Sequence, residues 1–247
     1  MRNWLSLSCV LVGSVLEGCS NDSCDAEGVV TLPEQSCIIF VDGGRLGLVR
    51  DHIEAEIRVG YARSSERISV EGTRFVVYEE PSRVIPEIGI GGFNPDTSNV
   101  EISIGASFPG LVESLQTNLA SIVSHELHHV ARRRTIGYGT SLTQAAISEG
   151  LADHFSLEAV GGSEPPIWSL ALEGEELATW VELLVDHQPQ VPYDHGRWFV
   201  GTAAAEVPRW TGYAVGFELV GRFLNEDPSR TPSGLVAEPA QSFVQDL

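Results

Sequence analysis

The segment His125-Glu126-Leu127-His128-His129 limits the possible folds of this 247-residue chain more than any other feature. Its outer histidines can bind one metal ion if they lie on one face of a helix, because side chains four residues apart are neighbours there. Glu126 would then point to the side of that ion. The surrounding sequence predicts such a helix from Leu111 to Arg134, with an apolar stripe along one side and three arginines in its last turn.

A second predicted helix carries carboxylates that would complete a metal site. It opens with the capping-box pattern of 141–144, ends at the glycine pair 161–162, and contains Glu149 and Asp153. The interval between His129 and Glu149 is long enough for the first helix to end and the second to return beside it. Two histidines and Glu149 would leave a fourth position open for water, as catalytic zinc sites do. Asp153 is expected to accept the outer N–H of a liganding histidine.

These residues give the chain a resemblance to the gluzincin metallopeptidases, whose pattern is His-Glu-x-x-His followed at about this distance by Glu-x-x-x-Asp. More narrowly, it looks like a bacterial family of predicted zinc-dependent proteases. That resemblance covers roughly Ile85 to Leu224 and rests on a Gly-Gly turn, an Asn-containing strand, His-Glu-Leu-His-His, the run 148–153 and the late motif Gly212-Tyr213-Ala214-Val215-Gly216.

The resemblance implies that His125, His129 and Glu149 hold Zn²⁺ and that Glu126 is the general base. It also implies that the strand Val100 to Ile104 borders the cleft and pairs with an extended substrate.

The expected chemistry is hydrolysis of a peptide or protein substrate by an activated water. Zinc lowers the pKa of water toward about 7, and Glu126 takes the proton and returns it to the leaving amine. The oxyanion needs a donor, for which Tyr213 and His195 are the candidates. A structural role in its loop is equally open for His195. His128 is turned about 100° from the ligands and is expected to pack or support them.

Two other functions compete with an active endopeptidase or aminopeptidase. One is a non-catalytic envelope lipoprotein that keeps the zincin fold and binds a peptide or protein partner. The other is a zinc-dependent hydrolase that acts on a non-peptide amide. The intact Glu126 favours an enzyme over the non-catalytic protein, because a protein without turnover is free to lose its base.

The first 36 residues are predicted to direct and tether the protein. Residues 1–18 form a signal peptide whose end, Leu16-Glu17-Gly18-Cys19, resembles the lipobox of bacterial lipoproteins, with Cys19 as the acylated residue. A plain secretory signal and a short buried helix are the alternatives. Residues 19–36 are polar and are interpreted as a tether. The expected location is therefore the bacterial envelope, lipid-anchored on the periplasmic or outer-membrane face.

Cysteine usage and charge agree with export. Cys24 and Cys37 remain as one pair after the signal and lipidated cysteines are set aside, and a disulfide between them suits an oxidising compartment. Two free thiols are the alternative. The formal net charge of −19 argues against nucleic acid as a partner and leaves only the lipid anchor for membrane contact. The sequence does not indicate an oligomeric state.

Apolar patterns predict one α+β catalytic domain over residues 37–247, with a zincin-like fold. A small N-terminal mixed sheet would precede a helical half that carries the metal site. Predicted strands cover 38–41, 75–78, 83–90 and 100–104, with Pro86 marking 83–90 as an edge strand and a turn at 91–96. A helix is expected over 46–61, and further helices over 111–134, 141–161, 175–186 and 212–224.

Overall fold

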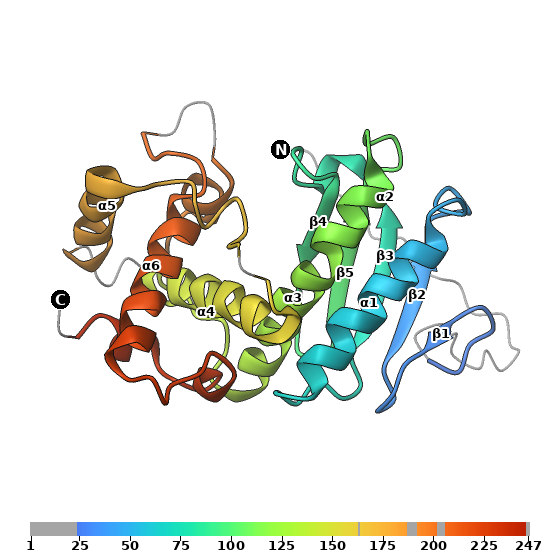
Figure 1. The fold of residues 1–247 in the computed structure, drawn as a ribbon, viewed down its shortest axis with the longest axis horizontal. Helices are drawn as coiled ribbons and strands as arrows, with labels where there is room; N and C mark the ends of the chain where they lie inside the picture. The colour runs from blue at the N-terminus through green and yellow to red at the C-terminus, as the bar shows by residue number, and fades with distance from the viewer. Residues whose placement is uncertain (1–23, 163, 187–191, 202–205, 246–247) are drawn as a thin grey trace, which may run out of the picture.

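The structure is a computed structural model that describes residues 24–162, 164–186, 192–201 and 206–245 (Figure 1). The predicted signal peptide 1–18 and the lipidation site Cys19 lie outside these residues. Within the described ranges, none of the helices combines the length and the apolar character needed to cross a bilayer.

The N-terminal half is a five-stranded mixed sheet covered by helices on one face (Figure 1). Its strands are β1 (Val30–Thr31), β2 (Cys37–Val41), β3 (Arg74–Glu79), β4 (Ile90–Phe93) and β5 (Asn99–Ile104). Their order across the sheet is β1-β2-β3-β5-β4, in which β2, β3 and β5 are parallel and the two edge strands are antiparallel. Helix α1 (Arg50–Ser65) makes the crossover from β2 to β3.

The prediction for 83–90 was wrong, because the edge strand begins where that segment ends. A 3₁₀ turn (η1, Pro81–Arg83) and a loop precede β4, and β4 contains Gly91 and Gly92, which we expected in a turn. Both positions require glycine, because a side chain at either one would clash with neighbouring atoms. A Cβ on Gly91 would lie 2.1 Å from the Arg83 carbonyl oxygen, and one on Gly92 would lie 2.5 Å from Oε1 of Glu126.

The implied role of Val100–Ile104 as the strand that pairs with substrate is also wrong. This segment is β5, and its two edges are already occupied by β3 and β4. β4 is the strand at the edge of the sheet on the side of the helical half (Figure 1).

The C-terminal half is helical, which confirms the predicted α+β order. The long helix expected over 111–134 is one helical run with a π-type segment in it, and the other expected helices are present with small shifts at their ends. The elements are α2 (Leu111–Ser114), η2 (Leu115–Leu119), α3 (Ala120–Thr135), α4 (Leu142–Val160), α5 (Gly174–Asp186), η3 (Gly196–Val200), α6 (Thr211–Glu226), η4 (Ser233–Leu235) and η5 (Ala240–Phe243).

Helix α3 joins the two halves, because it packs on the sheet and α1 on one side and on α4 on the other (Figure 1). One hydrophobic core fills the space between the sheet, α1 and α3, and a second lies among α4, α5, α6 and the C-terminal segment. Buried Arg132 ties α3 to that segment by donating to the carbonyl oxygens of Val236 and Glu238, at 2.9 and 3.0 Å. The polar residues of α3 and α4 therefore meet between two packed cores.

A disulfide between Cys24 and Cys37 links the first described residue to the beginning of β2, with a Cα–Cα distance of 5.5 Å. Between these cysteines, β1 pairs with β2 and Leu32 is buried. The part of the predicted tether 19–36 that begins at Cys24 is therefore folded against the sheet. A polar composition hid this short strand from sequence analysis.

Candidate metal centre

Three side chains from α3 and α4 converge at the centre of the molecule. Nε2 of His125 lies 3.0 Å from Oε2 of Glu149, and Nε2 of His129 lies 3.3 Å from the same oxygen. The two Nε2 atoms are 3.0 Å apart. Each of the three residues is only 5 or 6% exposed. The structure thus brings together the three residues that the sequence singled out as ligands.

The donor set and its spacing fit a zinc ion. Two imidazole nitrogens and one carboxylate oxygen are typical zinc ligands. Donors about 2.0–2.1 Å from a tetrahedral ion stand about 3.3 Å from one another, which is close to the separations among these three atoms. The cluster is therefore compatible with a metal site.

Asp153 is fully buried behind His125, and three side chains form hydrogen bonds with its carboxylate. Nδ1 of His125 lies 2.7 Å from Oδ1, the Trp168 indole nitrogen donates at 3.0 Å to Oδ2, and the Ser169 hydroxyl donates to Oδ2 at 2.6 Å. Burial opposes the charged imidazolium, yet Asp153 raises the pKa of His125 well above its usual value. The hydrogen bond between Nδ1 and Asp153 fixes the His125 ring so that Nε2 faces the cluster.

Tyr138, from the loop between α3 and α4, donates its hydroxyl to Oε1 of Glu149. This bond leaves Oε2 as the oxygen that faces the two histidines. Burial alone would raise the pKa of Glu149, but His129 and His125 hold it well below its usual value. The carboxylate is therefore ionised and oriented for a cation.

Glu126 lies beside the cluster and is only 6% exposed. Burial raises the pKa of its carboxyl group above the usual value, a change that makes it a better proton acceptor. The close approach of Gly92 keeps β4 against this side chain. The position agrees with the expectation that Glu126 points past the metal rather than at it.

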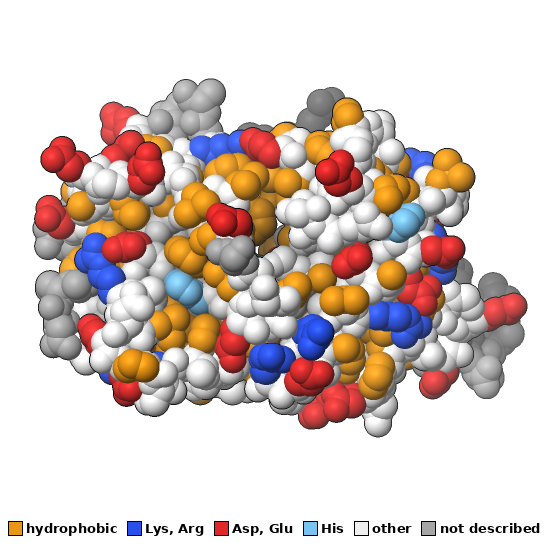
Figure 2. All heavy atoms as spheres, viewed as in Figure 1, with side chains coloured by type: hydrophobic (Ala, Val, Ile, Leu, Met, Phe, Trp, Pro, Cys, Tyr) orange, Lys and Arg blue, Asp and Glu red, His pale blue; other side chains and the backbone are white. Residues whose placement is uncertain are grey.

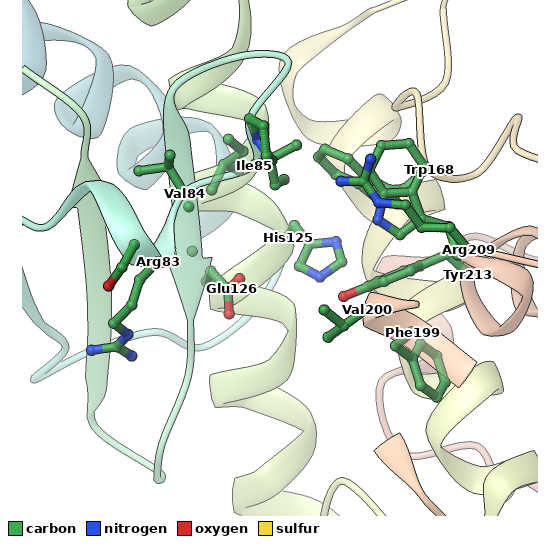
Figure 3. A pocket seen from close by; sticks show the side chains of 16 residues that line it. Arg83, Val84, Ile85, His125, Glu126, Trp168, Phe199, Val200, Arg209 and Tyr213 are labelled. Atoms are coloured by element: carbon green, nitrogen blue, oxygen red, sulfur yellow. The ribbon is translucent and has the colours of Figure 1, made fainter. Parts of the chain in front are cut away.

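Both candidate oxyanion donors reach the cleft. Figure 3 shows the Tyr213 side chain extending from α6 toward His125, with Glu126 on the other side. Burial and Glu149 raise the pKa of the Tyr213 hydroxyl well above its usual value, so it remains a donor. His195 borders the cluster but also stacks on Phe199, with ring centroids 4.6 Å apart, and burial lowers its pKa.

His128 faces away from the cluster, as its helical position predicts. It is fully buried, and its ring centroid lies 5.4 Å from that of Phe155. Within the described part of the chain neither of its ring nitrogens has a hydrogen-bond partner, nor has Nδ1 of His129.

Two cavities open on either side of the cluster and share Gly92, His125, Glu126 and Tyr213. The larger, of about 410 Å³, is mainly apolar and aromatic; its walls include Ile122, Trp168, Phe199 and Trp210 (Figure 3). The smaller, of about 220 Å³, has polar and charged side chains among its lining residues, including Asn94, Arg133, Tyr138 and His195. Figure 2 shows hydrophobic side chains gathered around a hollow in the middle of this face. The cluster is thus buried yet reachable from two sides.

Sequence reasoning missed Tyr138, Trp168 and Ser169. All three come from the segments that follow α3 and α4, where no periodicity indicates which side chains turn inward. A tryptophan close after a carboxylate-bearing helix was the only available signal, and tryptophan is more often a core residue.

Fold and site together define a mixed α+β protein with a buried two-histidine, one-carboxylate cluster at the floor of a cleft. Residues 65–245 match the family described as predicted Zn-dependent protease (DUF2268), and the chain belongs to that family. The resemblance inferred from the motifs is thereby confirmed at the level of the family.

Two uncharacterised proteins of Bacillus subtilis (strain 168) are similar to the chain. YjaZ is 29% identical over 138 residues, which cover 53% of this chain and 51% of YjaZ. YjfC is 23% identical over 177 residues, which cover 66% of this chain and 58% of YjfC. The chain therefore spans little more than half the length of these relatives. No solved structure shows a significant match.

Proposed function

We propose that the protein is a zinc-dependent metallopeptidase of the gluzincin type, with a zincin-like fold. The observation that carries this proposal is the convergence of His125, His129 and Glu149 in a zinc-like donor set, with Glu126 beside them in an open cleft. Family membership supports it.

Zinc bound by these three residues would supply the positive charge that acidifies a water molecule and polarises a peptide carbonyl. Glu126 accepts the proton of that water and passes it to the leaving amine. Tyr213, protonated and facing the cleft, donates to the oxyanion, with His195 as the second candidate. Asp153 keeps His125 in the orientation that the cation needs.

The edge of β4 near Gly92 is the natural place for an extended substrate, because the Ile90 end of this edge is already paired with Ile85. The Ile90 carbonyl accepts from the Ile85 amide at 3.0 Å, so the backbone of Ile90 faces away from β5. Residues alternate along a strand, and the backbone of Gly92 therefore faces the same way, next to Glu126. Pairing there would place a peptide bond beside the cluster, with neighbouring side chains in the two cavities.

The competing proposal is a zincin-fold protein that binds a partner without turnover. Such a protein would not need Glu126 to accept a proton. Glu126→Gln separates the two, because glutamine keeps the shape of the side chain but cannot accept a proton. We expect zinc content and folding to survive and turnover of a peptide found by profiling to fall by about 10²- to 10⁴-fold.

The comparison requires equal zinc occupancy in wild type and variant. Equal rates would eliminate the mechanism. A wild-type protein that holds zinc but cleaves nothing in a proteome-derived peptide library would favour the binding protein.

A further inference from the structure

Arg133 lies in the smaller cavity with the donor atoms of the metal cluster. It follows His129 by one helical turn on α3 and lines the same 220 Å³ space as His125, His129 and Glu149. Its guanidinium carbon stands 5.1 Å from the centroid of the Tyr138 ring. A fixed positive charge therefore sits beside the place where a substrate would react.

Asn94 holds the Arg133 guanidinium in place but occupies only two of its N–H donors. Nε of Arg133 donates to Oδ1 of Asn94 at 2.6 Å, and one terminal nitrogen donates to the Asn94 carbonyl at 3.1 Å. Arginine has five N–H donors, so three remain without a partner among the described residues. Asn94 is itself buried and bonded to the carbonyls of Asp96 and Asn99, which makes the anchor rigid.

The other arginines of the cleft are neutralised. Arg83 and Arg209 line the larger cavity, and they pair with Glu101 at 2.7 Å and Glu87 at 2.6 Å. For Arg133, the described residues include no carboxylate within ion-pair distance. Arg133 is thus a partly buried positive charge with no carboxylate partner among the described residues. This is notable because the chain as a whole carries a net charge of −19.

We propose that Arg133 binds a carboxylate of the substrate within one or two residues of the scissile bond. Arginine recognises carboxylates through two parallel hydrogen bonds, and its anchoring to Asn94 lowers the ordering cost of forming them. The carboxylate has two sources, an Asp or Glu side chain and the C-terminus of a short peptide. This inference rests on the proposed peptidase function.

The size of the cavity agrees with a small group at this position. A cavity of about 220 Å³ suits a group the size of one or two residues and not a folded domain. The Tyr138 and His195 side chains that share the cavity add polar walls, in contrast to the aromatic walls of the larger cavity.

The test starts from a peptide that the zinc-loaded wild-type protein cleaves in a proteome-derived library. Matched pairs of peptides are then compared: for each position beside the scissile bond, Glu against Gln with an amidated C-terminus, and a neutral sequence ending as free acid against the same sequence ending as amide. We expect kcat/KM to favour one member of a pair by about 10- to 100-fold, and which pair responds identifies the source of the carboxylate.

Variants at Arg133 then assign that preference. R133M should lower kcat/KM for the favoured peptide far more than for its neutral analogue, so that the ratio between the two falls toward one. R133K should keep part of the preference, and R133E should shift it toward Lys at the same position. A merely structural role would lower both peptides of a pair equally.

R134M is the matched control, because Arg134 is the next residue of α3 and also holds two loop carbonyls, those of Thr97 and Glu71, at 2.7 and 2.9 Å. It should keep the preference. A wild-type protein that cleaves both members of every pair equally, or an R133M protein that retains the preference, would overturn this inference. Absence of any cleavage by the wild type would instead overturn the proposed function.

Discussion

Glu149 is the residue on which the metal cluster depends most directly. One of its oxygens faces both histidines, and the other accepts from Tyr138, so a single carboxylate connects α3, α4 and the loop between them. A two-histidine site without this anion lacks a third donor and the charge that offsets the cation.

Replacing Glu149 with Ala should therefore reduce zinc affinity by more than the 10- to 100-fold that is typical for residues that only support a ligand. The measurement is the zinc content of the purified protein after dialysis against a graded chelator, compared with wild type and with Asp153→Asn. Asp153 contacts His125 from behind, and its variant should show the smaller loss. Stoichiometric zinc in Glu149→Ala would move the third ligand to another residue.

At this scale, helical spacing predicted which side chains share a face of one helix, and the interval between the helices together with the family resemblance predicted that the two faces meet. His125, His129, Glu149 and Asp153 lie on regular helices, where positions four apart share a face. Tyr138 and Trp168 were missed because they belong to connecting segments, whose path depends on tertiary packing. Arg133 could be placed on the helix, but only the three-dimensional structure shows that no carboxylate of the described residues pairs with it.

Among the secondary-structure elements, α4 and α6 make the closest approach in the helical half. A Cβ on Gly216 would lie 1.9 Å from the Ala146 carbonyl oxygen, and one on Gly150 would lie 2.2 Å from the Gly216 carbonyl oxygen. Two glycines thus let the helix backbones touch at the level of Glu149. The position of that ligand depends on this contact.

Gly216→Ala should push the helices apart and destabilise the protein by about 1–3 kcal/mol, because the added methyl group meets backbone atoms that cannot turn away. The measurement is the free energy of unfolding in urea. Gly221→Ala is the matched control on the same helix: its Cβ would lie 3.4 Å from Nε2 of His154, and the better helix propensity of Ala should offset the tight contact. Equal stability of the two variants would contradict the close-packing argument.

The strand β4 shows where element prediction from sequence fails. Adjacent glycines usually mark turns, and the apolar run before them looked like the strand. In the structure the glycines are required by neighbours: the backbone of Arg83, in the turn before β4, for Gly91, and the side chain of Glu126, from α3, for Gly92. The parallel strands β2, β3 and β5 were predictable, because short apolar runs and the alternation of Val100, Ile102 and Ile104 are local patterns.

For the molecule as a whole, the order of strands before helices was enough to predict the α+β class. The position of the cleft was not, because it depends on which strand lies at the edge. β4 occupies that edge because it pairs antiparallel with β5. The apolar pattern of the sequence does not indicate which strands pair.

The disulfide should contribute to global stability. Cys24 and Cys37 are separated by 13 positions, and closing a loop of this size stabilises by about 3 kcal/mol. The double replacement of both cysteines by Ser should lower the free energy of unfolding by about that amount, and a reductant should do the same to wild type but not to the variant. If reductant leaves wild-type stability unchanged, the bridge makes no contribution.

The same covalent link determines how a pulling force would enter the protein. Tension on the chain ahead of Cys24 passes through the sulfur bridge directly to β2, and so bypasses the two-residue pairing of β1, which would otherwise peel away first. β2 lies toward the opposite edge of the sheet from β4. A molecule held by its N-terminus would therefore receive that load at β2, with β3 and β5 between it and the strand that borders the cleft.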